Sequence, residues 1–344
     1  MLDLFYWILV CIMLKWSIIS NKGNHIMNLV LFIIIVLFEL YIIIRLAWGR
    51  SLMSLLIYFY VKVFVRKFKF KGSTDDVNKR IEKRKGIIEA TPKWIRRSKL
   101  LKEYEYESIK YYCMNEDSKS NIVMFYVHGG GFIEPLNKIQ FRFLKKIVRK
   151  TDAKVYLPLY PLIPNNSYKD AYPLLTNLYL KLKKENVDKE MAMGGDSAGG
   201  NIALVICEEI SKDQQPDELI LISPATTMYV EVGDKELVDS FKRCILVGYD
   251  GAKALALHWS DGDDVKSHYI SPYYGDVSNF KNVTMIIGEN DMAYGMGLRM
   301  VKKLKENNIK VKLIVGKGLY HVWALYPMLE AMKARKEIAK IICR

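Results

Sequence analysis

Short apolar runs recur along the second two thirds of the chain and alternate with segments of helical composition. The six clearest runs span residues 122–127, 154–159, 191–193, 218–223, 283–287 and 311–315. Such alternation is typical of a mostly parallel sheet with helices on both faces. Residues 75–105 and 225–265 do not follow it. We therefore expect an α/β fold with these two segments as candidates for a helical cap.

The first 65 residues have a different pattern. Residues 4–19 are nearly continuously apolar apart from Lys15, and residues 26–44 form a second apolar stretch that contains Glu39. At ~1.5 Å rise per residue, each stretch can approach or cross a hydrocarbon core of about 30 Å. We expect a transmembrane helical hairpin, with residues 52–65 at the membrane interface or as a third span. A buried hairpin of a soluble fold is the alternative.

These patterns divide the 344 residues into three parts. Residues 1–65 form the membrane-anchoring segment, and residues 66–110 form a basic linker that contributes to the cap. Residues 111–344 form the α/β domain, with a cap insertion at about 225–265. The part that follows the hydrophobic start has a normal size for a single domain of this class.

Positive charge is concentrated just after the apolar start. Residues 62–102 contain 15 Lys or Arg against 4 Asp or Glu, so they hold +11 of the chain's formal charge of +15. A basic segment beside membrane spans favours a cytoplasmic location for the domain that follows, and it also attracts anionic lipid. Nucleic acid is the other partner that such charge suggests. No recognisable nucleic-acid-binding motif accompanies the charge, so we expect none.

Two glycine-rich motifs carry the candidate chemistry. Residues 195–199 read Gly-Asp-Ser-Ala-Gly, the G-x-S-x-G spacing of a nucleophile elbow, in which a sharp strand-to-helix turn exposes the serine hydroxyl. Residues 128–131 read His-Gly-Gly-Gly, a loop whose bare N–H groups can approach a developing oxyanion. Each motif follows an apolar run. Together they predict an acyl-transfer site with Ser197 as nucleophile.

A serine nucleophile needs a base and an orienting acid, which in this arrangement follow it in the order acid, then histidine. The chain has five histidines: His25, His128, His258, His268 and His321. Only His321 lies beyond a plausible acid at a strand end, so it is the expected base. Glu289 and Asp291 both follow the run at 283–287, and spacing alone leaves them nearly equal.

The arrangement resembles the hormone-sensitive-lipase-like branch of the α/β-hydrolase superfamily, which includes bacterial carboxylesterases and arylacetamide deacetylases. The resemblance covers about residues 75–344. It rests on residues 128–132, 160–164 and 195–201, on the Ser-Pro pairs at 223–224 and 271–272, and on Asp291-Met-Ala and His321. Pro161 and Gly295 depart from the family pattern, where Arg and a second Asp are usual.

The resemblance implies an α/β-hydrolase fold and specific roles. It selects Asp291 as the acid of the triad. It implies that Gly129, Gly130 and Ala198 donate the oxyanion-hole N–H groups and that His128 anchors the loop. It implies neither a metal ion nor an organic cofactor.

The expected protein is a membrane-anchored serine hydrolase that cleaves small-molecule or lipid carboxylic esters through an acyl-enzyme intermediate. An acyltransferase or an amide deacetylase would use the same triad, and an inactive membrane scaffold that keeps the fold is the alternative of another class. The five cysteines are Cys11, Cys113, Cys207, Cys244 and Cys343. They are scattered and lack C-x-x-C spacing, so we expect neither a disulfide framework nor a zinc site, in agreement with a reducing compartment.

Overall fold

The computed structural model describes residues 25–65, 73–87, 93–96, 98–231 and 233–343 and divides into two compact units, residues 1–56 and 57–344. In the first unit, helix α2 (His25–Trp48) covers the second apolar stretch. None of the helices within these described ranges combines the length and apolar composition that crossing a membrane requires. The transmembrane helix expected over residues 26–44 is therefore not supported. Residues 4–19 lie outside the described residues.

The second unit is built on one eight-stranded sheet with the order β1-β2-β4-β3-β5-β6-β7-β8. Strands β3 to β8 are parallel, and β2 pairs antiparallel with both β1 and β4. The six predicted runs all form strands, so the mostly parallel sheet is confirmed. The strands are β1 (Leu101–Tyr106), β2 (Ile109–Met114), β3 (Ile122–Val127), β4 (Lys154–Pro158), β5 (Glu190–Asp196), β6 (Glu218–Ile222), β7 (Asn282–Asn290) and β8 (Lys310–Tyr320).

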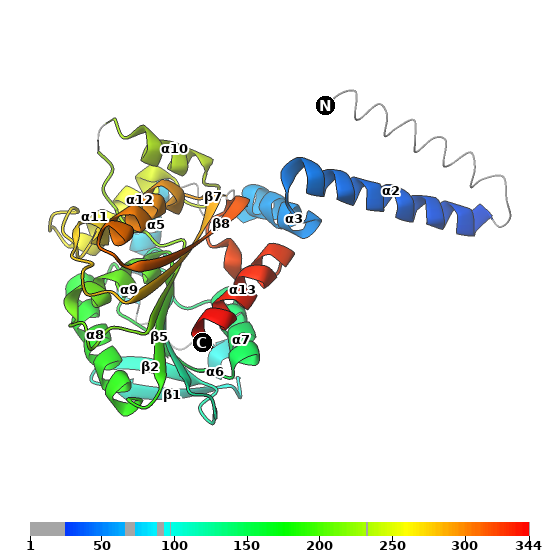
Figure 1. Ribbon diagram of the computed structural model, residues 1–344. Coiled ribbons are helices and arrows are strands. Elements are labelled where there is room, and N and C mark those ends of the chain that lie inside the picture. Colours follow the sequence, from blue (N-terminus) through cyan, green and yellow to red (C-terminus); the bar gives the residue numbers. More distant parts are fainter. Residues whose placement is uncertain (1–24, 66–72, 88–92, 97, 232, 344) are drawn as a thin grey trace. The chain divides into compact units, whose positions relative to one another are not determined.

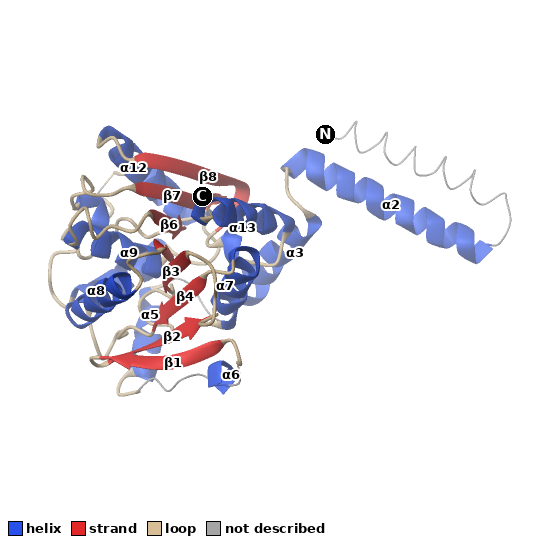
Figure 2. Cartoon of the chain, turned by 60° about the horizontal axis from the view of Figure 1, so that its bottom comes forward, coloured by secondary structure: helices blue, strands red, loops and turns tan. Residues whose placement is uncertain are grey.

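Helices cover both faces of this sheet (Figure 1 and Figure 2). Helices α7 and α13 lie on one face, and α8, α9 and α12 lie on the other. The elements after α2 are α3 (Leu52–Tyr60), the π-helical turn η1 (Val61–Val65), α5 (Thr74–Arg84), α6 (Lys93–Arg96), α7 (Lys138–Thr151), α8 (Tyr168–Glu185), α9 (Ala198–Glu209), α10 (Lys235–Arg243), α11 (Tyr249–Ser260), the 3₁₀ turn η2 (Pro272–Tyr274), α12 (Ala293–Glu306), the 3₁₀ turn η3 (Trp323–Leu325) and α13 (Leu329–Ile342).

Side chains of the central strands contribute to two hydrophobic cores, one on each face of the sheet. Successive side chains of a strand point to opposite faces. In β3, Val123 and Phe125 enter the core under α8 and α9, whereas Met124 and Tyr126 enter the core under α7 and α13. All six residues of β3 are buried, which explains why the strand is a continuous apolar run in the sequence.

The two expected cap segments differ in outcome. Residues 225–265 contain α10 and α11, and α11 contacts α5 from the other segment. The C-terminal part of residues 75–105 instead forms β1, an edge strand that exposes Lys102, Glu103 and Glu105. Polar residues interrupt the apolar residues of β1. The segment therefore contains no continuous hydrophobic run, and such a run was the sign by which strands were predicted.

Candidate active site

Ser197 stands at the turn between β5 and α9, the strand–turn–helix context that its motif requires. Its backbone φ of 52° and ψ of −118° are rare for a residue other than glycine. Neighbouring glycines allow the turn to close. A Cβ on Gly195 would lie 2.7 Å from the Gly200 nitrogen, and a Cβ on Gly199 would lie 2.6 Å from the carbonyl carbon of His128. The glycines therefore bring α9 against β5 and against the loop after β3.

Ser197, His321 and Asp291 form one hydrogen-bonded chain. His321 Nε2 lies 2.9 Å from Ser197 Oγ, and His321 Nδ1 lies 2.7 Å from Asp291 Oδ1. The three side chains follow the carboxyl ends of β5, β8 and β7, three strands that lie near one another in the sheet. Glu289 has a different contact, because its Oε2 accepts a hydrogen bond from the Gly318 N–H at 2.6 Å. The geometry thus separates the two acids that spacing alone did not.

The surroundings of Asp291 keep its carboxylate charged. The side chain is fully buried, and burial alone raises its pKa. The charge of His321 and its hydrogen bond outweigh that effect, so the pKa of Asp291 lies below its ordinary value. The Ala293 N–H also donates to Asp291 Oδ1 at 2.9 Å. A charged acid at this position favours the imidazole tautomer with its proton on Nδ1 and leaves Nε2 as the acceptor.

The glycine loop after β3 presents different N–H groups from those expected. The Gly129 N–H donates to Asp196 Oδ1 at 3.0 Å, so it is not available to a substrate. Gly130, Gly131 and Ala198 line the pocket beside Ser197. Within the described residues, the N–H groups of these three donate to no acceptor. Gly129, expected as an oxyanion donor, is therefore an anchor of the loop, because its N–H is already bonded.

A buried polar network holds this anchor. Asp196 is only 3% exposed, and it accepts hydrogen bonds from the Tyr126 hydroxyl at 2.8 Å and from Gln140 Nε2 at 3.0 Å, besides the one from Gly129. Gln140 Nε2 also donates to the Gly129 carbonyl at 3.1 Å. Burial raises the pKa of Asp196 despite these donors. Sequence reasoning missed the network: Asp196 was visible inside the G-x-S-x-G motif, but nothing in the sequence pointed to Gln140.

His128 lies buried at the base of the loop. Its ring stacks on Tyr160 with centroids 4.6 Å apart, and the Tyr160 hydroxyl donates to the His128 carbonyl at 2.9 Å. Burial lowers the pKa of His128 to about 4, so the ring is neutral at physiological pH. His258 is exposed on α11, and His268 bonds Glu209 at 2.7 Å. Of the histidines whose contacts are described, His321 is the one bonded to the serine.

The serine opens into a pocket of about 240 Å³. Its lining is mostly apolar, and much of it comes from the expected cap segment 225–265. Behind the pocket, Phe132 stacks on Trp259 with ring centroids 4.5 Å apart. The apolar lining residues from the cap segment are Ala225, Met228, Leu246, Val247, Ala252 and Leu255. The pocket therefore suits an apolar substrate group next to the nucleophile.

The other expected cap segment, residues 75–105, contacts a pocket residue through ion pairs. Glu134 lies at the pocket beside Gly130, and its N–H donates to the Gly130 carbonyl at 3.0 Å. The Glu134 carboxylate pairs with Arg80 and, at 3.0 Å, with Arg84 Nη2, both on α5. A Cβ on Gly130 would lie 2.6 Å from the Glu134 carbonyl oxygen. Helix α5 is thus tied by its charges to the loop that carries the free N–H groups.

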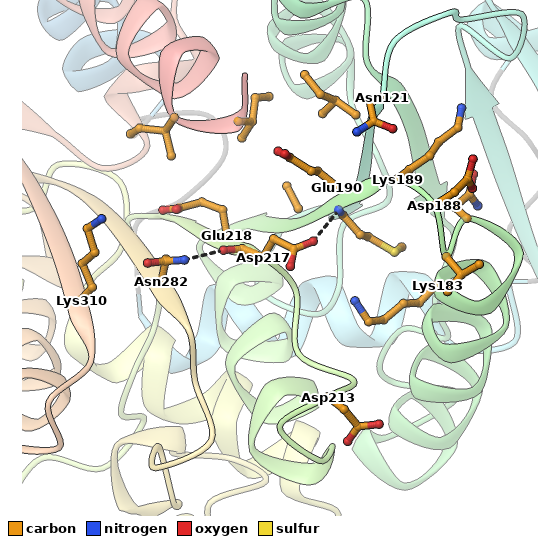
Figure 3. A pocket seen from close by; sticks show the side chains of 17 residues that line it. Asn121, Lys183, Asp188, Lys189, Glu190, Asp213, Asp217, Glu218, Asn282 and Lys310 are labelled. Atoms are coloured by element: carbon orange, nitrogen blue, oxygen red, sulfur yellow. Dashed lines mark hydrogen bonds between the residues drawn. The ribbon is translucent and has the colours of Figure 1, made fainter. Parts of the chain in front are cut away.

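A larger cavity of about 660 Å³ lies elsewhere, and Figure 3 shows its charged lining. It is formed at the amino ends of β5 to β8 by residues such as Glu190, Glu218 and Lys310. Asp217 in its wall already accepts hydrogen bonds from the Met191 N–H at 2.9 Å and from Lys281 Nζ at 3.1 Å. Open α/β sheets bind ligands at the carboxyl ends of their strands. We therefore place the candidate site at Ser197.

Other sequence features fit around this site. Gly295, one departure from the family pattern, donates its N–H to Ser240 Oγ at 3.2 Å, and a Cβ there would lie only 3.0 Å from the same oxygen. The missing side chain therefore lets α10 pack closely on α12. Among the described residues, no cluster of His, Cys, Asp and Glu side chains could hold a metal ion. The described cysteines are free thiols: Cys113, Cys207, Cys244 and Cys343.

Solved structures share the fold of most of the chain. A putative esterase from Staphylococcus aureus superposes with a TM-score of 0.73 at 22% identity, over 81% of this chain and 98% of that chain. A hormone-sensitive-lipase homologue, EstE7 from a metagenome library, superposes with a TM-score of 0.68 at 18% identity, over 84% of this chain and 97% of that chain. At these identities the likeness establishes the fold.

Sequence comparisons agree. An esterase of Acinetobacter venetianus is 22% identical over 225 residues, which cover 63% of this chain and 73% of that protein. Probable carboxylesterase 1 of Arabidopsis thaliana is 23% identical over 222 residues, or 59% of this chain and 70% of that protein. An esterase of Gibberella moniliformis matches over 36% of its own length. The family model of the α/β-hydrolase fold matches residues 124–325. The chain therefore belongs to the α/β-hydrolase fold family, as a hydrolase of the carboxylesterase and lipase type.

Proposed function

We propose that the protein cleaves carboxylic esters through a covalent acyl-enzyme on Ser197, with His321 as general base and Asp291 as the orienting acid. The observation that carries the proposal is the hydrogen-bonded chain from the serine Oγ through both ring nitrogens of His321 to a buried carboxylate. Nucleophile, base and orienter within hydrogen-bond reach are the parts that activate a serine hydroxyl.

The reaction proceeds in two halves. Ser197 Oγ attacks the ester carbonyl carbon while His321 Nε2 takes the hydroxyl proton. The tetrahedral intermediate collapses, the bond to the alkoxide breaks, and the alkoxide leaves with the proton from His321. Water then attacks the acyl carbonyl and gives a proton to His321. The bond between the acyl carbon and Ser197 Oγ breaks, His321 returns the proton to Oγ, and the acid leaves. Asp291 stays ionised throughout and stabilises the imidazolium.

We assign the oxyanion hole to the N–H groups of Gly130, Gly131 and Ala198. All three residues line the pocket at Ser197, and their N–H groups have no acceptor among the described residues. Ala198 is the first residue of α9, whose N-terminal N–H groups are unpaired and carry the positive end of the helix dipole. Donors fixed in advance at a developing negative charge lower the barrier most effectively.

We infer that the acyl group of the substrate is short and apolar. The pocket of about 240 Å³ is smaller than the roughly 300–1,000 Å³ of sites that enclose drug-sized ligands. A series of p-nitrophenyl esters of increasing acyl length tests both proposals. We expect hydrolysis by the unaltered chain to be fastest for the shorter esters and to be abolished by Ser197→Ala in a folded protein. Comparable turnover by that variant would overturn the catalytic assignment.

Assays on the same purified protein distinguish ester hydrolysis from the two alternatives, which are other acyl chemistry and an inactive scaffold. Acyl transfer would show as an ester or amide product when an alcohol or amine is added, and amide cleavage would show with an anilide of the same acyl group. An inactive scaffold would give no turnover with any of these and no covalent labelling of Ser197. The short hydrogen bonds of the triad favour a working enzyme over a scaffold.

We also propose that the enzyme works at the cytoplasmic face of a membrane. The support is the sequence alone: an apolar start and a net charge of +11 over residues 62–102. Cell fractionation followed by protease treatment of sealed vesicles tests the proposal. Recovery of the full chain in the soluble fraction, with none left on the membranes after a salt wash, would contradict it.

A further inference from the structure

Helix α7 has an unusual charge pattern. Its 14 residues include six basic side chains and no acidic one: Lys138, Arg142, Lys145, Lys146, Arg149 and Lys150. None of the six forms an ion pair with another described residue. Many of them are three or four residues apart, a spacing at which like charges repel across one face of a helix. The fold therefore keeps an uncompensated cationic stripe along α7.

Helix α13 extends this surface. It packs beside α7 on the same face of the sheet (Figure 1 and Figure 2) and exposes Lys333, Lys336 and Lys340. Two acids of α13, Glu330 and Glu337, compensate part of the charge, and Glu337 pairs with Lys340 at 3.1 Å and with Lys312 of β8 at 2.9 Å. On the opposite face of the sheet, by contrast, Lys181 pairs with Glu185 within α8. The exposed basic residues of these two helices are called the α7/α13 face below.

Exposed apolar side chains lie on the same two helices. Ile139 on α7 is 38% exposed, and Leu329 and Met332 on α13 are 46% and 57% exposed. All three occur in the first turn of their helix, close to the carboxyl edge of the sheet. Ile139 also lines the pocket of Ser197. The apolar end of the α7/α13 face therefore borders the mouth of the candidate active site.

We propose that the α7/α13 face docks on the surface of an anionic lipid bilayer. Cationic side chains along the face pair with anionic headgroups, and the apolar side chains at its one end enter the interface between headgroups and acyl chains. A nucleic acid would satisfy the charges but would offer no apolar layer for Ile139, Leu329 and Met332. Docking in this orientation places the pocket mouth next to the lipid. The proposal does not depend on the catalytic roles of the triad.

The test compares vesicles of phosphatidylcholine with vesicles that also contain phosphatidylglycerol, using the full chain. The variant is Arg142→Gln/Lys145→Gln/Arg149→Gln, which removes three cations of α7. The matched control is Lys184→Gln/Lys302→Gln/Lys305→Gln, which removes three cations from exposed positions on α8 and α12. The apolar N-terminal segment is present in every protein, so the ratio of affinities for the two vesicle types isolates the contribution of charge.

We expect the unaltered chain and the control to prefer anionic vesicles, and the α7 variant to lose more than tenfold of that preference. A cation near an anionic surface contributes about a fivefold change in binding. Thermal melting of both variants should match that of the unaltered chain, which verifies folding and keeps this result separate from the catalytic proposal. Equal preference for anionic vesicles in the α7 variant and the unaltered chain would overturn the inference. The inference would also be overturned if the unaltered chain bound duplex DNA more tightly than anionic vesicles and the α7 variant lost that binding to DNA.

Discussion

The assignment of Gly129 as an anchor predicts that even a methyl group at this position is harmful. In Gly129→Ala, the new Cβ would lie 2.6 Å from Asp196 Oδ2 and closer still to the Asp196 carbonyl oxygen. A carbon and an oxygen in such a contact rest about 3.3–3.6 Å apart. The loop or Asp196 must therefore move by about 1 Å. If the loop moves, the N–H donors of Gly130 and Gly131 shift away from Ser197. If Asp196 moves, Ser197 shifts with it, because the two residues are adjacent in the chain.

A displacement of about 1 Å at reacting groups costs about a hundredfold in rate. We therefore expect kcat of Gly129→Ala on a p-nitrophenyl ester to fall about a hundredfold, with a stability loss of about 1–3 kcal/mol from overpacking. Labelling by a fluorophosphonate should slow in parallel, because its transition state uses the same N–H groups. Thermal melting measures the stability loss separately.

Gly262→Ala is the matched control. Gly262 has a φ of +85°, and a Cβ there would meet no atom within 4 Å. The control should lose roughly 1 kcal/mol of stability through its backbone conformation and should keep its kcat. A Gly129→Ala enzyme with kcat within about threefold of the unaltered chain would refute the anchoring argument, since a change of that size needs no displacement of the loop.

Three further predictions follow from the same contacts. Asp291→Asn should lower kcat by ~10³–10⁴-fold, as loss of the imidazole tautomer does in other triads, whereas Glu289→Gln should cost less than about tenfold in the same steady-state assay; the reverse order would assign the acid to Glu289. Because the pKa of Asp291 lies below its ordinary value, its proton is gained only in stronger acid, where its contribution to folding is also lost. Infrared difference spectra of the unaltered chain against Asp291→Asn should therefore show the Asp291 carboxylate still ionised at the pH where an ordinary aspartic acid takes up its proton, about 3.9. A protonated Asp291 carboxyl at that pH would contradict this. Glu134→Gln should lower kcat by about two- to fivefold with little change in KM, because partly exposed ion pairs are weak; an effect confined to KM would show that Glu134 contacts the substrate instead.

The parts of the fold that the sequence predicted are those in which every residue faces a core. Strand β3 is buried on both faces, so its apolar run is unbroken and its position followed directly. Strand β1 lies at the edge of the sheet and pairs with one neighbour only. Exposed charges separate its apolar residues Leu101, Tyr104 and Tyr106, so it contains no apolar run from which a strand could be predicted. The α2 stretch shows the opposite difficulty, since an apolar run predicted a membrane span that the described helices do not support.

The candidate site was predictable where the chemistry constrains the motif. Ser197 and His321 followed from the G-x-S-x-G spacing and the order of the triad, and the structure places their side chains in contact. The choice of Asp291 over Glu289 came from the family resemblance, because two residues of separation along an exit loop do not reveal which carboxylate turns toward the histidine. In the structure Asp291 contacts His321, and Glu289 accepts from the Gly318 N–H. The role of Gly129 depends on Asp196, 67 residues away, and no local pattern contains that hydrogen bond.

The central claim is that Ser197 forms the covalent intermediate, and the mass of the labelled protein tests it most directly. After treatment with a fluorophosphonate, the chain should gain one phosphonyl group, and peptide mapping should place it on the segment 194–201. Ser197→Ala should gain none while its melting temperature stays close to that of the unaltered chain. An adduct on any other serine, or an equal adduct in Ser197→Ala, would contradict the account.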